Sequence, residues 1–306
     1  MRFYYRAAYT CAMLNNQPMG FYRPSTLIHD AKLHGLKIRP IDVQQSGWDC
    51  TLERLNEIEQ HKYSDPFAMR IGLRCVRGLR QEIGDAIAET RASGGPFASE
   101  YDLKRRVAAI RKTELTQLAN AGALNWTGEK HDRRTALWRA ERAGQSVGPL
   151  FEHIPDRFEI DTSSPLLSMT IDERLVADFF LTGFTVGPHP MQYHRAKMNA
   201  AGVIRAAELK NVPDGTFVRI AGAVIARQRP GTASGFIFIS GEDESGISNS
   251  IVHPKVYEQN RIAVTRGRFL LVEGTLQNQD GVVSVKASAV RVLELGPIDM
   301  RSHDFH

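Results

Sequence analysis

The sequence predicts a multidomain α+β protein, with a mostly helical N-terminal part followed by a small five-stranded β-barrel. Two observations support this fold class. Before residue 205 the apolar residues recur mainly at helical spacing. From Gly215 to Val292 the chain instead shows five short stretches rich in Val, Ile and Phe, separated by breaks that contain glycine. With 306 residues, the chain is long enough for two or three domains with separate cores.

The composition is that of a globular protein, with 42% hydrophobic and 24% charged residues. The N-terminus has no apolar run of signal-peptide length, and no segment is apolar enough to span a membrane. We therefore expect a cytoplasmic protein with no membrane partner. The cysteines Cys11, Cys50 and Cys75 are far apart in the sequence and form no CxxC pair. This spacing predicts reduced thiols, and neither a disulfide framework nor a zinc site.

Positive charge is concentrated in one segment. The chain has a formal net charge of +5, and residues 66–144 contain 15 Lys and Arg against 9 Asp and Glu. A basic excess in one segment is typical of a surface that contacts nucleic-acid phosphates. We expect the electrostatic contact surface in this segment.

The first helical element with clear end signals is a short amphipathic helix from Pro24 to Gly35. The stretch from Ile71 to Ile87 then predicts an apolar helix, a tight turn at Gly78 and a second helix, as in a helix-hairpin-helix. In that motif, backbone N–H groups of the hairpin face a DNA phosphate. Gly78 allows the backbone to approach the phosphate closely. Arg80 occupies the position of the motif's usual second glycine, so it either weakens the match to the motif or adds a side-chain contact to the phosphate. An ordinary helical hairpin explains the pattern equally well.

A second, poorer hairpin is predicted at residues 115–124, with Gly122 in its turn. Between the two hairpins lies the basic run Lys104, Arg105 and Arg106. Such a run is usually a solvated helix face, but its position between two candidate hairpins favours phosphate contacts.

Residues 149–165 have little regular pattern and predict a linker or an ordered loop. Just before this stretch a glutamine begins a segment that ends in Leu150 and Phe151, which is similar to peptides that dock on bacterial sliding clamps. Packing of Leu150 and Phe151 inside the protein is the simpler interpretation. After the linker, Thr170 and Glu173 form a capping-box pattern at the start of a helix that runs to Phe180.

The order of elements in the C-terminal part is three strands, a helix at residues 254–266 and two further strands. This is the order of the OB-fold, a Greek-key barrel whose usual ligands are oligonucleotides and oligosaccharides. In the first strand, Val218, Ile220 and Val224 alternate with Arg219 and Arg227, so we expect the apolar residues in the core and both arginines on the outer face.

In the second strand, Ile237 and Ile239 lie on one face, and Phe236 and Phe238 lie on the other. Exposed phenylalanines could stack on bases, whereas buried ones would fill the barrel, and the sequence leaves both possibilities open. The loop that follows the first strand contains Arg227 and Arg229 and is a place where OB-folds often hold a nucleic-acid strand.

No catalytic or metal site is predicted. The successive acids Glu242, Asp243 and Glu244 lie at a turn, where solvated side chains are more common than metal ligands. The pairs His189 with His194 and His303 with His306 have no cysteine or carboxylate framework around them. The chain contains no P-loop, nucleophile elbow or kinase signature.

Several strings of residues carry a resemblance to a known family. They are 14–22 (LNNQPMGFY), 39–43 (RPIDV), 46–53 (SGWDCTLE), 189–191 (HPM), 227–233 (RQRPGTA) and 304–306 (DFH). Together they resemble the C-terminal region of the bacterial error-prone DNA polymerase, a C-family enzyme related to the DNA polymerase III alpha subunit. The chain departs from the family at His253, where a tryptophan is expected, and at Ser234, where a lysine is common.

The resemblance implies five segments along the chain. They are the end of the polymerase fingers (1–65), a helix-hairpin-helix region (66–144), a linker with helices (145–204), the OB-fold domain (205–295) and a tail (296–306). The family's palm carboxylates, which hold two magnesium ions, match no position of this chain. The resemblance therefore implies no catalytic residue and no cofactor here.

The implied function is DNA binding within an error-prone, damage-tolerant polymerase, with single-stranded template as the DNA partner. The residues expected to contact DNA are Gly78, Arg80, Lys104, Arg105, Arg106, Arg219, Arg227, Arg229, Phe236 and Phe238. The alternative is an interaction module with little DNA affinity, which docks the sliding clamp or mutasome subunits through the barrel and through Leu150 and Phe151. A free-standing nuclease or polymerase would need converging carboxylates, which the sequence does not show.

Overall fold

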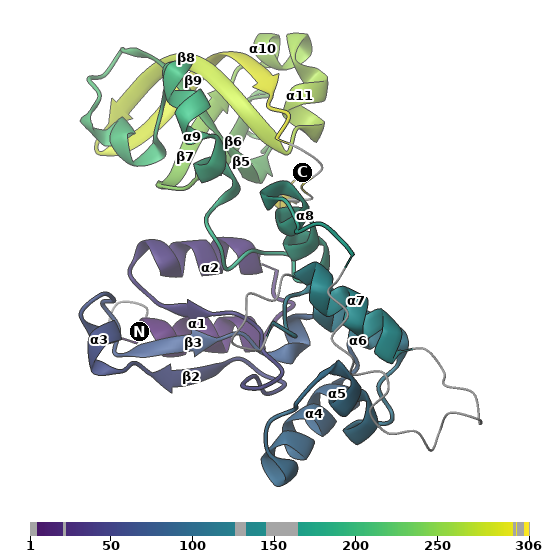
Figure 1. Ribbon diagram of the computed structural model, residues 1–306. Coiled ribbons are helices and arrows are strands. Elements are labelled where there is room, and N and C mark those ends of the chain that lie inside the picture. Colours follow the sequence, from purple (N-terminus) through teal and green to yellow (C-terminus); the bar gives the residue numbers. More distant parts are fainter. Residues whose placement is uncertain are drawn as a thin grey trace. The chain divides into compact units, whose positions relative to one another are not determined.

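The computed structural model describes residues 5–20, 23–125, 133–144, 165–295, 298 and 303–305. Residues 303–305 are described by their backbone alone. The chain divides into two compact units (Figure 1). Unit 1 comprises Met1–Pro18 and His34–Val186, and unit 2 comprises Met19–Leu33 and Gly187–His306. This division does not test the boundaries predicted at residues 65, 144 and 204, which stay predictions.

Unit 1 begins with a helix and a small sheet. Its first elements are α1 (Arg6–Asn15), β1 (Ile38–Arg39), β2 (Thr51–Arg54), α3 (Glu57–Gln60) and β3 (Phe67–Arg70). The central strand β3 pairs in parallel with β1 and antiparallel with β2. Ala68 and Met69 of β3 are fully buried, so this strand anchors the core of the sheet.

The rest of unit 1 is helical. It consists of η1 (Leu73–Cys75), α4 (Gln81–Gly94), α5 (Glu100–Arg106), α6 (Lys112–Asn120), α7 (Arg133–Ala143) and α8 (Ile171–Leu181). The predicted capping box of α8 is confirmed, because Thr170 Oγ1 accepts from the Glu173 backbone and Glu173 accepts from the Thr170 backbone.

The hairpin around Gly78 differs in part from its prediction. Gly78 has φ +81° and makes the expected turn, and α4 follows it with Ile83 and Ile87 buried. The predicted apolar helix before the turn is wrong, since only the short 3-10 turn η1 is present. The backbone N–H groups of Leu73 and Arg74 donate to the carbonyls of residues 47 and 48, and these bonds hold the segment beside residues 47–48.

Unit 2 is a β-barrel with short helices. Its elements are α2 (Pro24–Leu33), α9 (Pro190–Ala200), β4 (Val203–Ile204), η3 (Ala206–Asn211), β5 (Phe217–Gln228), β6 (Ile237–Asp243), β7 (Gly246–Val252), α10 (Pro254–Gln259), α11 (Arg261–Arg266), β8 (Phe269–Gln279), β9 (Val282–Val292) and β10 (His303–Phe305). All five predicted barrel strands and the helical segment between the third and the fourth are confirmed. No helix within the described part of the chain is long and apolar enough to cross a membrane.

The barrel closes in the order β5-β6-β7-β9-β8, with β8 pairing back onto β5. Its core is apolar and includes Val218, Ile220, Val224, Ile237 and Ile239. Strands approach closely at two glycines. A Cβ atom on Gly222 would lie 2.8 Å from the Glu242 carbonyl oxygen, and one on Gly274 would lie 2.2 Å from that of Lys286. Glycine at these positions therefore allows the barrel to close.

Candidate nucleic-acid interface

A groove of about 530 Å³ lies on the outer surface of the barrel, lined by residues from all five barrel strands. Phe238 is 37% exposed in this groove, whereas its neighbours Ile237 and Ile239 are in the core. The question that the sequence left open is thus decided for this strand, because the isoleucines face inward. Phe238 presents an exposed aromatic ring of the kind on which bases stack.

The groove is polar without being cationic. The amides Gln228, Asn249, Gln277 and Gln279 line it, together with serines, and Asp280 is the charged residue among its described lining residues. Ser240 Oγ donates to Asn249 Oδ1 at 2.9 Å, which leaves the amide hydrogens of Asn249 for another acceptor. Amide side chains can donate to and accept from base edges.

A row of side chains crosses the groove. In the strand register Gln228 lies opposite Phe238, Phe238 opposite Ile251, and Ile251 opposite Lys286. Paired residues on neighbouring strands project from the same face, so the exposed Lys286 supplies a cation at one end of the row. Neither Lys286 nor the amides were among the predicted contacts. The period-two pattern of β8 and β9 was the signal that could have found Gln277, Gln279 and Lys286.

Arg227 does not share the face of Arg219, so that prediction is wrong. A register shift between Val224 and Ala226 places a bulge in β5, and the extra residue reverses the alternation beyond it. Arg227 therefore lies opposite the core residue Ile239 and is 9% exposed. Its guanidinium donates to the Val264 carbonyl at 2.6 Å and to the Gly267 carbonyl. These bonds fix the helical segment to the barrel wall.

The other predicted barrel residues have mixed environments. Arg219 is half-exposed and pairs with Glu273 at 2.8 Å, and Arg229 is exposed with its guanidinium 5.2 Å from the ring centroid of Tyr257. The ring of Phe236 packs edge-on against His253, with centroids 5.0 Å apart. Phe238 is the predicted contact that the structure brings into the groove, and its DNA-binding role, like those of the other residues, stays a prediction.

In unit 1, an internal carboxylate occupies the position expected for a phosphate. Glu114, which is almost fully buried, accepts from the Arg80 backbone N–H at the start of α4. It also forms a bidentate pair with the Arg80 guanidinium, at 2.8 and 2.9 Å. Burial raises the pKa of Glu114, but these hydrogen bonds and that from Arg111 outweigh it and lower the pKa below its usual value.

The basic run on α5 is partly used inside the protein. Lys104 Nζ donates to the carbonyls of Ala108 and Ile110. The Arg106 guanidinium donates to the Thr90 carbonyl in α4 and to the carbonyls of residues 95 and 96 just after this helix. It also stacks on Phe97, with 4.5 Å to the ring centroid. Arg105 is 76% exposed and paired with Asp102, which makes it the most accessible residue of the run.

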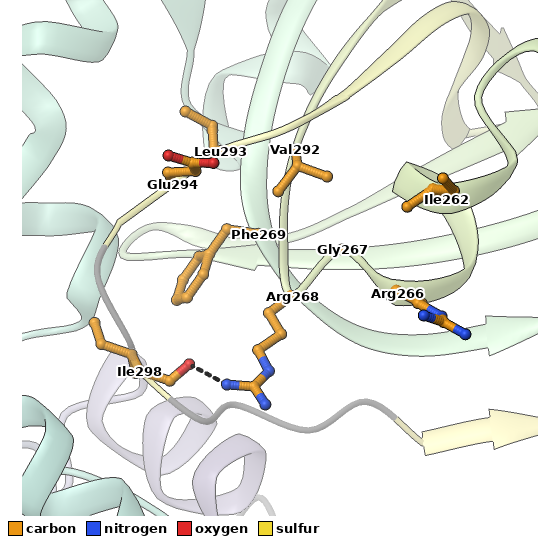
Figure 2. A pocket seen from close by; sticks show the side chains of 9 residues that line it. All are labelled: Ile262, Arg266, Gly267, Arg268, Phe269, Val292, Leu293, Glu294 and Ile298. Atoms are coloured by element: carbon orange, nitrogen blue, oxygen red, sulfur yellow. Dashed lines mark hydrogen bonds between the residues drawn. The ribbon is translucent and has the colours of Figure 1, made fainter.

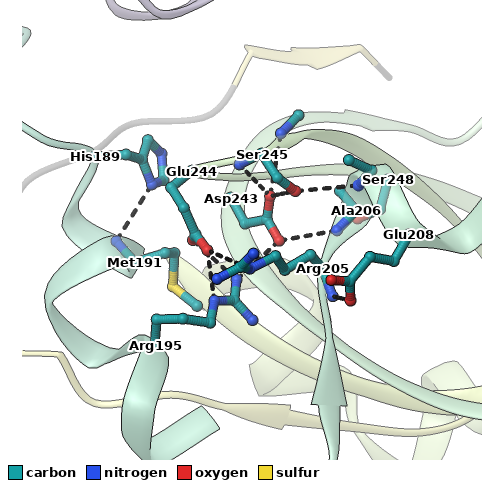
Figure 3. Close-up of polar contacts among 12 residues, drawn as sticks. His189, Met191, Arg195, Arg205, Ala206, Glu208, Asp243, Glu244, Ser245 and Ser248 are labelled. Carbon is teal, nitrogen blue, oxygen red and sulfur yellow. Dashed lines mark hydrogen bonds and ion pairs between the residues drawn. The ribbon is translucent and has the colours of Figure 1, made fainter. Parts of the chain in front are cut away.

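The acidic turn of the barrel is buried, so the prediction of solvated side chains is wrong. Asp243 is 1% exposed, and Arg195 of α9 pairs with Asp243 at 3.0 Å and with Glu244 at 2.5 Å (Figure 3). Asp243 also accepts from the Ala206 backbone at 3.0 Å. The cation that neutralises the acids comes from a helix 48 residues earlier in the chain, which the local sequence pattern does not show.

His29, His189 and Glu242 form the group of potential metal ligands in the described residues, with ligand atoms within 4.8 Å of one another. His189 Nδ1 accepts from the Met191 N–H at 3.2 Å, so its proton is on Nε2 (Figure 3). His29 Nε2 lies 2.9 Å from the Asp243 carbonyl and donates to it. Both Nε2 atoms thus carry hydrogens and lie 3.5 and 3.8 Å from Glu242 Oε1. This hydrogen bonding does not fit a metal ion.

The same group is strongly desolvated. Burial raises the pKa of the Glu242 carboxyl to about 7 and lowers the pKa of His189 to about 4. Burial also lowers the pKa of His29. The physical cause is that a charged form loses its hydration inside the barrel, so each group favours its neutral form.

A second hollow, of about 570 Å³, is lined by Ile262, Arg266, Phe269 and Val292 among others (Figure 2). Arg268 at its edge donates to the Ile298 carbonyl at 3.3 Å. The described residues that line this hollow include no Asn or Gln side chain and none of the predicted DNA contacts. The groove at Phe238 is therefore the better candidate interface. The predicted partner contacts Leu150 and Phe151 lie outside the described residues.

Comparison with known families agrees with both parts of this architecture. Residues 35–136 match the family model of a helix-hairpin-helix motif, and residues 218–293 match that of an OB-fold nucleic acid binding domain.

Curated relatives match over nearly the whole chain. An error-prone DNA polymerase of Anaeromyxobacter dehalogenans (strain 2CP-C) is 41% identical over 304 residues, which is 99% of this chain and 26% of that protein. One of Pseudomonas aeruginosa (strain PAO1) is 39% identical over 303 residues, or 98% of this chain and 28% of that protein. The chain thus spans about a quarter of the length of these relatives.

Among solved structures, the asparaginyl-tRNA synthetase of Pyrococcus horikoshii is 30% identical over 26% of this chain and 20% of that chain, with a TM-score of 0.23. A Replication Protein A heterotrimer bound to ssDNA is 19% identical over 28% of this chain and 62% of that chain, with a TM-score of 0.21. Likenesses of this size carry no functional information. Over almost its full length, the chain is similar in sequence to the C-terminal region of error-prone DNA polymerases.

Proposed function

We propose that this chain supplies DNA binding to an error-prone, damage-tolerant DNA polymerase, and that the barrel groove binds single-stranded template. The observation that carries the proposal is the row across the groove, in which the exposed Phe238 ring lies between Gln228 and Ile251, with Lys286 beyond. A ring for stacking, amides for base edges and one cation for a phosphate match what an unpaired strand offers.

The groove favours contacts to bases over contacts to the backbone. Its described lining includes no lysine or arginine, and Lys286 stands at its edge. Each phosphate that a protein neutralises makes the affinity fall more steeply with salt. Binding in this groove should therefore depend only weakly on salt, and a steep dependence would arise from the exposed cations of unit 1, such as Arg105.

Polymerising chemistry is proposed to lie outside these residues. The buried acids are engaged, since Asp243 and Glu244 pair with Arg195 and Glu114 pairs with Arg80. Two-metal catalysis needs carboxylates that converge on open positions for metal and substrate. We accordingly propose that the chain uses no magnesium of its own, and primer extension by the purified chain with magnesium would overturn this part.

The test compares two exposed phenylalanines of the same barrel. Phe238 lies in the groove, whereas Phe217 is 60% exposed at the start of β5 and does not line it. Loss of one stacking ring costs about 1–3 kcal/mol, so Phe238→Ala should weaken binding of a fluorescent oligothymidylate about 5- to 150-fold. Fluorescence anisotropy at low and moderate salt measures the affinity.

Phe217→Ala is the matched control and should bind as the wild type does. Equal affinities for Phe238→Ala and the wild type would remove the groove as the binding site. Negligible binding by the wild type even at low salt would refute DNA binding altogether and favour the interaction module. That alternative docks the sliding clamp or mutasome subunits through the barrel and through Leu150 and Phe151.

A further inference from the structure

Three cysteines that are far apart in the sequence come together in unit 1. Cys11 on α1 donates its S–H to the Cys50 carbonyl at 3.0 Å. Cys50 directly precedes β2, and Cys75 is the last residue of η1. Cys50 Sγ accepts from the Gly72 N–H at 3.4 Å, and the Cys75 N–H donates to the Gly72 carbonyl at 3.2 Å, so Gly72 brings both cysteines to the same place. The sequence spacing predicted reduced thiols, and the fold in addition brings the three cysteines close together.

The backbone holds the two thiols together. Leu73 N donates to the Gly47 carbonyl at 2.9 Å, and Arg74 N donates to the Trp48 carbonyl at 3.0 Å. Gly72 makes the approach possible, because a Cβ atom there would lie 2.3 Å from the carbonyl carbon of residue 49. The segment that leads to Cys50 and the turn that ends at Cys75 are thus fixed side by side.

The surroundings favour a thiolate on Cys50. Its Sγ accepts from the Gly72 N–H at 3.4 Å, and Arg74 lies nearby, held by Asp49 at 2.7 Å. The hydrogen bond from the Cys75 thiol, aided by Gly72 and Arg74 and opposed by burial, lowers the pKa of Cys50. The same shared hydrogen bond, together with burial, raises the pKa of Cys75. Burial raises the pKa of Cys11 to about 11, which leaves that thiol unreactive.

We propose that Cys50 and Cys75 form a peroxide-sensitive dithiol site, in which Cys50 is the attacking sulfur and Cys75 the resolving one. Cys50 is buried and Cys75 is partly exposed, so the site requires an oxidant that is small enough to enter past Cys75. Redox-sensing cysteines are typically a thiolate beside a resolving thiol, and this pair has that arrangement.

The chemistry balances with hydrogen peroxide as the oxidant. The Cys50 thiolate attacks one peroxide oxygen, the O–O bond breaks, and a sulfenic acid forms as hydroxide leaves. Cys75 then loses its proton, its sulfur attacks the sulfur of Cys50, and the S–O bond breaks to release a second hydroxide. Two thiols are oxidised by two electrons, and the peroxide becomes two water molecules. An external dithiol reverses the reaction by exchange.

The test uses the full chain, reduced and then exposed to a small excess of hydrogen peroxide. Before any labelling, mass spectrometry of the oxidised chain should show a mass lower by about 2 Da than that of the reduced chain. The remaining thiols are then alkylated for peptide mapping. The peptide map should contain a linked Cys50–Cys75 peptide with Cys11 alkylated, and dithiothreitol should restore all three thiols. Cys75→Ser should stop at a sulfenic acid on Cys50 that dimedone traps, and Cys50→Ser should give neither product.

Cys11→Ser is the matched control and should form the bridge as readily as the wild type. Because the main readout is made on the wild type, a variant that fails to fold does not weaken it. Absence of the Cys50–Cys75 link in the folded wild type would overturn the proposal. So would a predominant Cys11–Cys50 link, or an equal yield of the bridge when the chain is unfolded in urea.

Discussion

Asp243→Ala should strongly destabilise the barrel of unit 2. The carboxylate accepts from Arg195 and from the Ala206 backbone through Oδ2, both at 3.0 Å. Through Oδ1 it accepts from the backbone of Ser245 at 2.8 Å and of Gly246 at 3.1 Å, and from the Ser245 hydroxyl. One side chain thereby joins α9, the start of η3 and the β6–β7 turn.

The size of the effect follows from these bonds. The hydrogen bond to the buried guanidinium contributes about 2 kcal/mol, because one partner is charged and water cannot replace it. Each backbone bond contributes about 0.5 kcal/mol after partial replacement by water, since residues 206, 245 and 246 are only partly buried. Arg195 keeps its pair with Glu244, so the total loss is about 3.5 kcal/mol.

Hydrogen exchange measured by mass spectrometry suits this test, because all three tryptophans fall within the sequence range of unit 1 and tryptophan fluorescence does not report on the barrel. The slowest amides of β6 and β7 should lose about 300-fold in protection. Glu258→Ala removes an exposed acid from the same unit and should leave protection unchanged. A loss of less than about fivefold for Asp243→Ala would refute the reasoning.

Three further outcomes are expected. Because burial raises the pKa of Glu242 to about 7, above its unfolded value, its contribution to stability is present in acid and is lost as pH rises through 7. Glu242→Gln should therefore be more stable than the wild type at pH 8 in urea unfolding followed by circular dichroism, by about 2 kcal/mol, and a steeper loss than in the wild type would contradict this. Arg227→Lys should lower barrel stability by about 1–2 kcal/mol, since an ammonium does not reproduce the bonds of the guanidinium to two carbonyls; a fall in the salt dependence of DNA binding with unchanged stability would instead identify a phosphate contact. Alanine at both Leu150 and Phe151 should abolish pull-down by a sliding clamp if the segment docks there, and unchanged pull-down would remove that role.

The barrel could be predicted from sequence because its signals are local. Alternating apolar residues and glycine breaks mark each strand within a few positions, and the helical insert identifies the strand order. Local patterns also located Phe238. They could not decide that Ile237 and Ile239 face inward, because both faces of that strand are apolar and only the rest of the barrel distinguishes them.

The errors have non-local causes. A single bulge reversed the face of Arg227. The alternation of apolar residues along one strand does not reveal such an extra residue unless the pairing with the neighbouring strand is known. The acids at the β6–β7 turn looked solvated because Arg195, which neutralises Asp243, is remote in the sequence. In each case the deciding contact joins elements that are separated by many residues.

The short strand β10 gives the barrel one further property. It pairs in parallel with β5 along residues 226–228, where β5 has left the register with β8. An edge strand with free N–H and C=O groups is a template for strands of other molecules, and β10 occupies that template from within the chain. If β10 is displaced, the same backbone groups can recruit a strand from a second molecule. Self-association that grows with protein concentration would then be the first sign that the tail has detached.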